Sequence, residues 1–214
     1  VYNDNEETIT DLVMAMIPEI FRVLKDDSWF VGFFDVNKIG YNNFMKRTLT
    51  RRANQDEKRA MGLTWWCEQA GFSFVSSIPA MWVKPNKSQG IIGNPQKGMI
   101  AAYEAFIFAS KGDAILLKQG RNNIFMFDTL PTDERTFALQ MPMDVCLEVL
   151  NMVVLGGGRV LDPFAGVGSF GLAALEKQCE FRGYELNEKR ASDGNMLLNE
   201  FQMLKEDKDV KVGV

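Results

Sequence analysis

Histidine is absent from this sequence of 214 residues. Its absence excludes the Ser-His-Asp and Cys-His catalytic groups, the HExxH zinc helix and any histidine general base. Cysteine is scarce, because only Cys67, Cys146 and Cys179 occur, and they form no CxxC pair. We therefore expect neither a disulfide framework nor a metal site, and we interpret the three cysteines as buried, reduced thiols of a cytoplasmic protein.

Long apolar runs are also missing. Charged residues interrupt every hydrophobic stretch well before it reaches the roughly 18 residues that a membrane span needs. The N-terminal stretch VYNDNEETITD is acidic and does not resemble a signal peptide. We therefore expect no membrane partner. The formal net charge of -4 argues against strong non-specific attraction to nucleic acid, so any DNA binding would need a local basic surface.

The chain does contain enough apolar side chain for a substantial core. Hydrophobic residues make up 46% of it, and 16 phenylalanines are among them. A single domain of this length buries about 70% of its unfolded surface. We therefore expect one domain over residues 1–214.

The spacing of apolar residues predicts the secondary structure of the first two thirds. Helices are predicted over residues 8–25, 39–52, 56–70 and 140–154, and strands over 29–34, 72–83, 103–108 and 124–127. Thr8 or Thr10 could cap the first helix, and Pro79 should disturb the second strand. Residues 84–98 contain three lysines, three glycines and no acidic residue, which predicts a basic loop.

The last quarter reads as a strand–loop–helix–strand–helix unit. A strand over residues 159–161 is followed by the loop DPFAGVGSFG, a helix over 172–177, a strand over 179–184 and a helix over 187–204. Consecutive strands joined by a helix run parallel, so the class is α/β with a doubly wound, mostly parallel sheet.

The loop after the first of these strands has the residues of a nucleotide site. Gly166 and Gly168 let a ligand approach the backbone, and Glu185 ends the next strand 19 residues after Gly166. In a doubly wound fold these two points lie side by side at the carboxyl edge of the sheet, and a carboxylate there can accept both ribose hydroxyls. The GxGxxG spacing, completed by Gly171, also fits an NAD-dependent oxidoreductase or a turn without a ligand. Asp162 would repel a pyrophosphate but suits a cation, which favours S-adenosyl-L-methionine.

DPFAGVGS, followed by a strand ending in GYELNE, resembles the cofactor motifs of the permuted DNA amino-methyltransferases, which methylate adenine N6 or cytosine N4. Further segments match that family in order, namely RVLK at 22–25, MWVKPN at 81–86, GNP at 93–95, YE at 103–104, SKG at 110–112 and FALQMP at 137–142. The resemblance implies the Rossmann-like fold of methyltransferases that use S-adenosyl-L-methionine, with circularly permuted motifs. Residues 137–204 would form the cofactor half, and residues 1–130 the substrate side.

The resemblance also implies the residues of the site. The cofactor would contact Asp162, Pro163, Phe164, Ala165, Gly166, Gly168, Ser169, Glu185, Gln140 and Pro142. The loop over 84–98 would face double-stranded DNA with its target base flipped out, through Lys84, Asn86, Lys87 and Lys97. Phe137, Ala138, Leu139 and Met141 stand where the family has His, Pro, Thr and Lys, which would weaken that wall of the pocket.

One family motif is missing altogether. The catalytic tetrapeptide of the family is Asp, Asn or Ser followed by Pro-Pro and an aromatic residue, yet none of the seven prolines is adjacent to another. The catalytic residues are therefore unknown. The family order places the tetrapeptide on a central strand just before Val1, so we expect a piece of a longer protein, completed by an upstream domain or within a homodimer. A non-catalytic domain that binds cofactor or a partner is the alternative.

Overall fold

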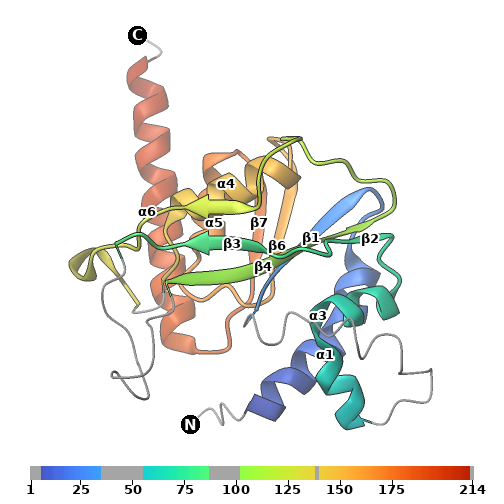
Figure 1. Ribbon diagram of the computed structural model, residues 1–214. Helices are drawn as coiled ribbons and strands as arrows, with labels where there is room; N and C mark the ends of the chain where they lie inside the picture. The colour runs from blue at the N-terminus through green and yellow to red at the C-terminus, as the bar shows by residue number, and fades with distance from the viewer. Residues whose placement is uncertain (1–5, 35–54, 87–101, 138–139, 213–214) are drawn as a thin grey trace. The chain divides into compact units, whose positions relative to one another are not determined.

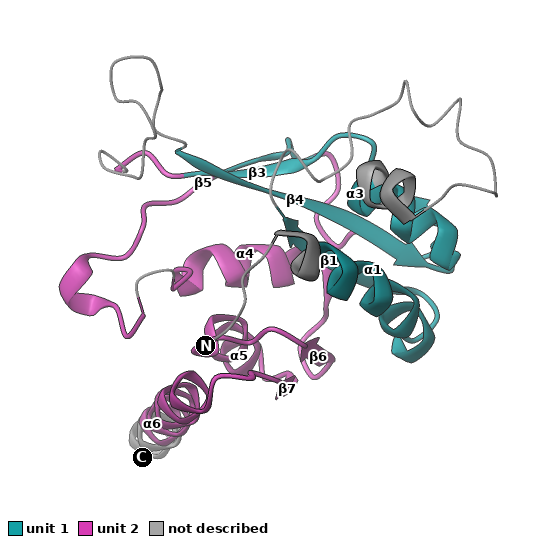
Figure 2. Cartoon of the chain, turned by 90° about the horizontal axis from the view of Figure 1, so that it is seen from below, with its two compact units in different colours: residues 1–83, 101–115, 121–125 teal, residues 84–100, 116–120, 126–214 magenta. Residues whose placement is uncertain are grey.

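The computed structural model of the protein describes residues 6–34, 55–86, 102–137 and 140–212. The helix predicted over 39–52 lies outside the described residues. The chain divides into two compact units (Figure 2). Unit 1 comprises residues 1–83, 101–115 and 121–125, and unit 2 comprises residues 84–100, 116–120 and 126–214. None of the described helices is long and apolar enough to cross a membrane.

Strand β4 is the centre of the larger sheet (Figure 1). It pairs antiparallel with three strands, and a fifth strand follows on the far side of β3. These elements are β1 (Ser28–Phe34), β2 (Phe74–Val75), β3 (Ala80–Val83), β4 (Tyr103–Lys111) and β5 (Ile124–Met126). Since β1 and β3 are both antiparallel to β4, they run in the same direction as each other, with β4 as the reversed strand between them.

Two helices cover one face of this sheet. They are α1 (Glu6–Val23) and α3 (Gln55–Ala70). Their apolar residues Ile17, Leu63 and Cys67 are fully buried with Ile107 of β4. The helical spacing therefore predicted the right core face. The expected cap was wrong, because α1 already begins at Glu6 and so encloses both Thr8 and Thr10.

The predicted strand over 72–83 is divided into β2 and β3, with Pro79 between them. Proline has no N–H to donate to a strand ladder, so the interruption has a direct cause. Gly71 ends α3 with φ of 103°, as expected of a glycine after a helix.

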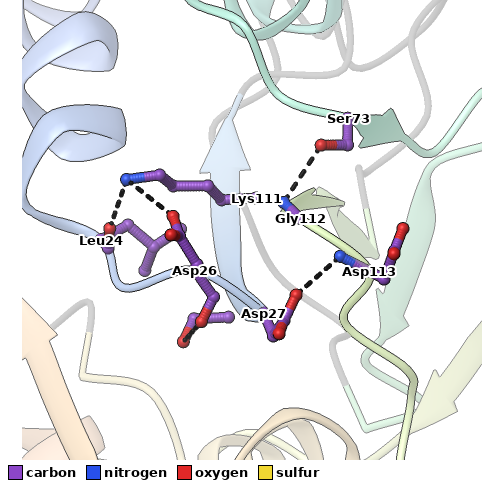
Figure 3. A network of polar contacts seen from close by, with 8 residues as sticks. Leu24, Asp26, Asp27, Ser73, Lys111, Gly112 and Asp113 are labelled. Carbon is purple, nitrogen blue, oxygen red and sulfur yellow. Dashed lines mark hydrogen bonds and ion pairs between the residues drawn. The ribbon is translucent and has the colours of Figure 1, made fainter.

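A polar turn fixes the connection between α1 and β1 (Figure 3). Lys111 Nζ, at the end of β4, donates to the Leu24 carbonyl at 2.8 Å and forms an ion pair with Asp26 at 3.3 Å. The Asp27 side chain accepts a hydrogen bond from the Asp113 backbone N–H at 2.8 Å. Lys111 of the SKG segment therefore contacts Leu24 of the RVLK segment and the turn that follows it.

Unit 2 contains the strand–loop–helix–strand–helix order predicted for the last quarter. Its elements are η1 (Thr132–Glu134), α4 (Met143–Val153), β6 (Arg159–Asp162), α5 (Ser169–Glu176), β7 (Glu180–Gly183) and α6 (Glu188–Val212). β6 and β7 pair in parallel, so the mixed α/β class is confirmed. Cys146 of α4 and Ala173 of α5 are buried in one cluster, against which Val160 and Phe181 of the strands pack.

Candidate cofactor-binding site

The site begins where β6 ends. The Tyr184 backbone N–H donates to the Asp162 carbonyl at 2.9 Å, and the Ala165 N–H donates to the Tyr184 carbonyl at 2.9 Å. The chain after β6 is thus held against the chain after β7. Gly166 and Gly168 then adopt φ of 56° and 83°, a region that L side chains enter only with strain. This left-handed turn brings the chain to the N-terminus of α5.

Glu185 closes the loop from the other strand. Its Oε2 accepts a hydrogen bond from the Gly166 N–H at 3.1 Å, and its Oε1 accepts one from the Asn187 N–H at 2.8 Å. The predicted meeting of Gly166 and Glu185 at one edge of the sheet is therefore observed. Each carboxylate oxygen still has a lone pair, so two hydroxyl donors can be accepted in addition.

Asp162 is the second carboxylate of the site. Its Oδ1 accepts a hydrogen bond from the Phe164 N–H at 2.9 Å. Burial raises the pKa of Asp162 above its usual value; the hydrogen bond from Phe164 lowers it, and the charge of Glu185 raises it further. A cationic group near Asp162 and Glu185 would offset both effects, whereas a phosphate would add to the repulsion.

The third glycine of the GxGxxG pattern serves packing. A Cβ on Gly171 would lie 2.7 Å from the Phe181 ring and 2.8 Å from Leu198 of α6. Gly183 is similarly confined, since its Cβ would lie 2.8 Å from Cβ of Ala165. These glycines let α5, β7 and α6 approach closely, so the pattern alone does not indicate a dinucleotide.

The sequence analysis missed Leu186 and the cap at Asn187. Leu186, directly after Glu185, is 75% exposed, and the predicted site residue Phe164 is 54% exposed, so apolar side chains flank the carboxylates. Asn187 Oδ1 accepts a hydrogen bond from the Arg190 N–H at 3.0 Å and so caps α6. An Asn directly before the first residue of α6, Glu188, was the available signal for this cap.

The FALQMP segment lies at the start of α4. Pro142 precedes the first residue of α4 and is buried. Gln140 Oε1 accepts a hydrogen bond from the Thr136 N–H at 2.8 Å, and the Gln140 N–H donates to the Phe137 carbonyl at 3.0 Å. The Arg190 guanidinium lies 4.1 Å from the centre of the Phe137 ring. This segment therefore contacts the helix that Asn187 caps.

Comparison with protein families shows the family to which the chain belongs. A family model described as DNA methylase matches residues 2–196. The chain belongs to the family of N6/N4 DNA methylases. The resemblance found in the DPFAGVGS and GYELNE segments is thereby confirmed. No curated protein sequence matches the chain.

Solved structures support the methyltransferase fold. M1.HpyAVI, solved in complex with SAM, is 18% identical with a TM-score of 0.65, and the match covers 87% of this chain and 81% of that one. TTHA0409 of Thermus thermophilus, solved with S-adenosyl-L-methionine, is 19% identical with a TM-score of 0.57 over 92% of this chain and 79% of that one. The cytosine-N4-specific PvuII DNA methyltransferase is 14% identical with a TM-score of 0.64 over 91% and 72%. Like these, this member of the DNA methylase family has the Rossmann-like fold.

Two of the four residues predicted to face DNA, Lys84 and Asn86, are described in the structure, and both are engaged within the protein. Lys84 is only 6% exposed. Asn86 Oδ1 accepts hydrogen bonds from the N–H and the hydroxyl of Thr129 at 2.9 and 3.1 Å, while Asn86 Nδ2 donates to the Thr129 carbonyl at 3.1 Å. Asn86 thus fastens two segments of unit 2 together. Lys87 and Lys97 lie outside the described residues, and DNA contact through these four residues stays a prediction.

Proposed function

We propose that this chain binds S-adenosyl-L-methionine between Asp162 and Glu185 and serves methyl transfer to the exocyclic amine of adenine (N6) or cytosine (N4) in DNA. The observation that carries the proposal is the closure of the glycine loop on Glu185 in a member of the DNA methylase family. Two structural relatives, M1.HpyAVI and TTHA0409, were solved with this cofactor.

Each part of the site suits one part of this ligand. Glu185 would accept the ribose hydroxyls, since both of its oxygens retain a lone pair. Asp162 would face the positively charged methionine end, which lowers the cost of its burial. The exposed side chains of Leu186 and Phe164 would cover the apolar base. When bound, the cofactor supplies an electrophilic methyl group.

The competing oxidoreductase function fits less well. A nicotinamide dinucleotide places a pyrophosphate at the glycine loop, where Asp162 and Glu185 already repel each other. Gly171, which completes the GxGxxG pattern, is accounted for by packing against Phe181 and Leu198. The two carboxylates therefore favour the cationic ligand.

Catalysis needs groups that the sequence lacks. The target amine is a weak nucleophile because its lone pair is delocalised into the base, so acceptors for its hydrogens and an aromatic plate for the flipped base are required. No Pro-Pro pair occurs in the sequence to provide them. In the part of the chain that is described, β6 pairs only with β7, which leaves its other edge unpaired. We infer that a strand from a preceding segment or a partner chain pairs there and carries the tetrapeptide.

Exposed side chains of β6 and β7 also indicate that this two-stranded sheet is incomplete in the described part of the chain. Parallel strands are normally buried on both faces, yet Leu161 of β6 is 48% exposed and Arg182, its partner on β7, is exposed too.

The expected setting of the protein is the cytoplasm, consistent with three buried free cysteines among the described residues.

The test is methyl incorporation into duplex DNA from cofactor carrying a labelled methyl group. We expect incorporation by a protein extended upstream of Val1 and little by residues 1–214 alone. Incorporation by neither form, with S-adenosylhomocysteine still bound, would instead support the non-catalytic alternative. If the extended protein incorporates label, hydrolysis of the DNA distinguishes N6-methyladenine from N4-methylcytosine.

A further inference from the structure

Phe137 and Pro142, at the two ends of the FALQMP segment, adjoin different helices. Pro142 leads directly into α4, whose Cys146 is buried together with Ala173 of α5. The Arg190 guanidinium of α6 lies 4.1 Å from the Phe137 ring centre. Phe137 therefore contacts the first turn of α6.

The contacts of Arg190 continue to the glycine loop. The Arg190 N–H donates to Asn187 Oδ1 at 3.0 Å, and the Asn187 N–H donates to Glu185 Oε1 at 2.8 Å. Glu185 Oε2 in turn accepts a hydrogen bond from the Gly166 N–H at 3.1 Å. An unbroken series of contacts thus joins Phe137 to the loop that would hold the cofactor.

We propose that the Arg190–Phe137 pair is a positioning device for Glu185. Stacking on Phe137 fixes the first turn of α6, and Asn187 at the start of that helix holds the ribose-binding Glu185. The inference rests on the proposed function, because the ligand positioned is S-adenosyl-L-methionine.

Gln140 supports the position of Phe137. Its Oε1 accepts a hydrogen bond from the Thr136 N–H, and its N–H donates to the Phe137 carbonyl. These two hydrogen bonds hold the residue whose ring Arg190 stacks on.

The experiment is calorimetric titration of S-adenosylhomocysteine into the wild-type chain and into Arg190→Ala, Arg190→Lys, Phe137→Leu and Phe137→Tyr. We expect Arg190→Ala and Phe137→Leu to weaken binding about threefold to tenfold, as loss of a partly exposed cation–π contact implies. Phe137→Tyr keeps an aromatic face and should bind like the wild type, while Arg190→Lys should fall between. The double variant Arg190→Ala/Phe137→Leu should be no weaker than the worse single variant.

Lys189→Ala is the matched control, since Lys189 is the neighbouring cation and pairs with Asp193 on the same helix. The melting temperature without ligand is measured for every variant. A purely structural role would lower it while leaving the dissociation constant unchanged, and that result overturns the proposal. Wild-type affinity in both Arg190→Ala and Phe137→Leu overturns it as well. No binding by the wild-type chain overturns the proposed function together with this inference.

Discussion

Glu185 and Asn86 occupy similar positions after a strand, but their side chains differ in the capacity to accept hydrogen bonds from a ligand. Each follows a strand by a few residues, and the side-chain oxygens of each accept hydrogen bonds that include one from a backbone N–H of a distant segment. Glu185 accepts one hydrogen bond on each oxygen and retains lone pairs for a ligand. Asn86 Oδ1 accepts two hydrogen bonds from Thr129 and has no lone pair left. Of the two side chains, only Glu185 retains oxygen lone pairs that can accept the hydroxyls of a ligand.

The comparison predicts its largest effect for Glu185→Ala. This change removes the acceptor for Gly166 and Asn187 as well as for the ribose, so S-adenosylhomocysteine should bind at least about 100-fold more weakly, as expected when charge-assisted hydrogen bonds are lost. Calorimetric titration measures the change. Glu180→Ala, which removes an exposed carboxylate of β7, is the control and should bind normally. Equal affinity in both variants would contradict the assignment of Glu185.

A substitution at Gly171 tests the closeness of α5, β7 and α6. Gly171→Ala places a Cβ 2.7 Å from the Phe181 ring, so the free energy of unfolding should fall by about 1–3 kcal/mol through overpacking. Urea denaturation measures it. Gly157→Asn is the control, because a Cβ there meets nothing within 4 Å and Asn tolerates a positive φ. Unchanged stability in Gly171→Ala would mean that this glycine is free for a ligand instead.

Asn86→Ala should act on stability and leave cofactor binding alone. It leaves the N–H of Thr129 without its acceptor, so we expect a loss of about 1–2 kcal/mol in the free energy of unfolding. Asn199→Ala, on the exposed side of α6, should cost much less. Chemical denaturation and titration with S-adenosylhomocysteine check both parts. Weaker DNA binding by Asn86→Ala without any loss of stability would show that the side chain contacts substrate after all.

The smallest effect is expected from the pH dependence of Asp162. Its pKa is raised in the folded protein, so between the unfolded and folded pKa values the folded state binds more protons. Stability of the unliganded protein should therefore decrease as pH rises through this interval. Asp162→Asn should remove that slope and weaken binding of the cationic cofactor. Parallel pH profiles of the melting temperature for the two proteins would disprove this.

The sequence was most informative where structure is local. The parallel unit around β6 and β7 followed from a glycine loop and two strand patterns, and the meeting of Gly166 with Glu185 followed from the sheet geometry. What the sequence could not reveal were contacts between distant segments. Asn86 with Thr129 and Arg190 with Phe137 are set by tertiary packing, and no periodicity encodes them. The cap at Asn187 was readable but was overlooked.

The direct test of the cofactor site is titration of the wild-type chain with S-adenosylhomocysteine and, side by side, with NADH. Asp162 and Glu185 at one glycine loop predict saturable binding of S-adenosylhomocysteine at a single site and no heat with NADH. Binding of NADH, or no binding of S-adenosylhomocysteine, would contradict a site built for a cationic nucleoside.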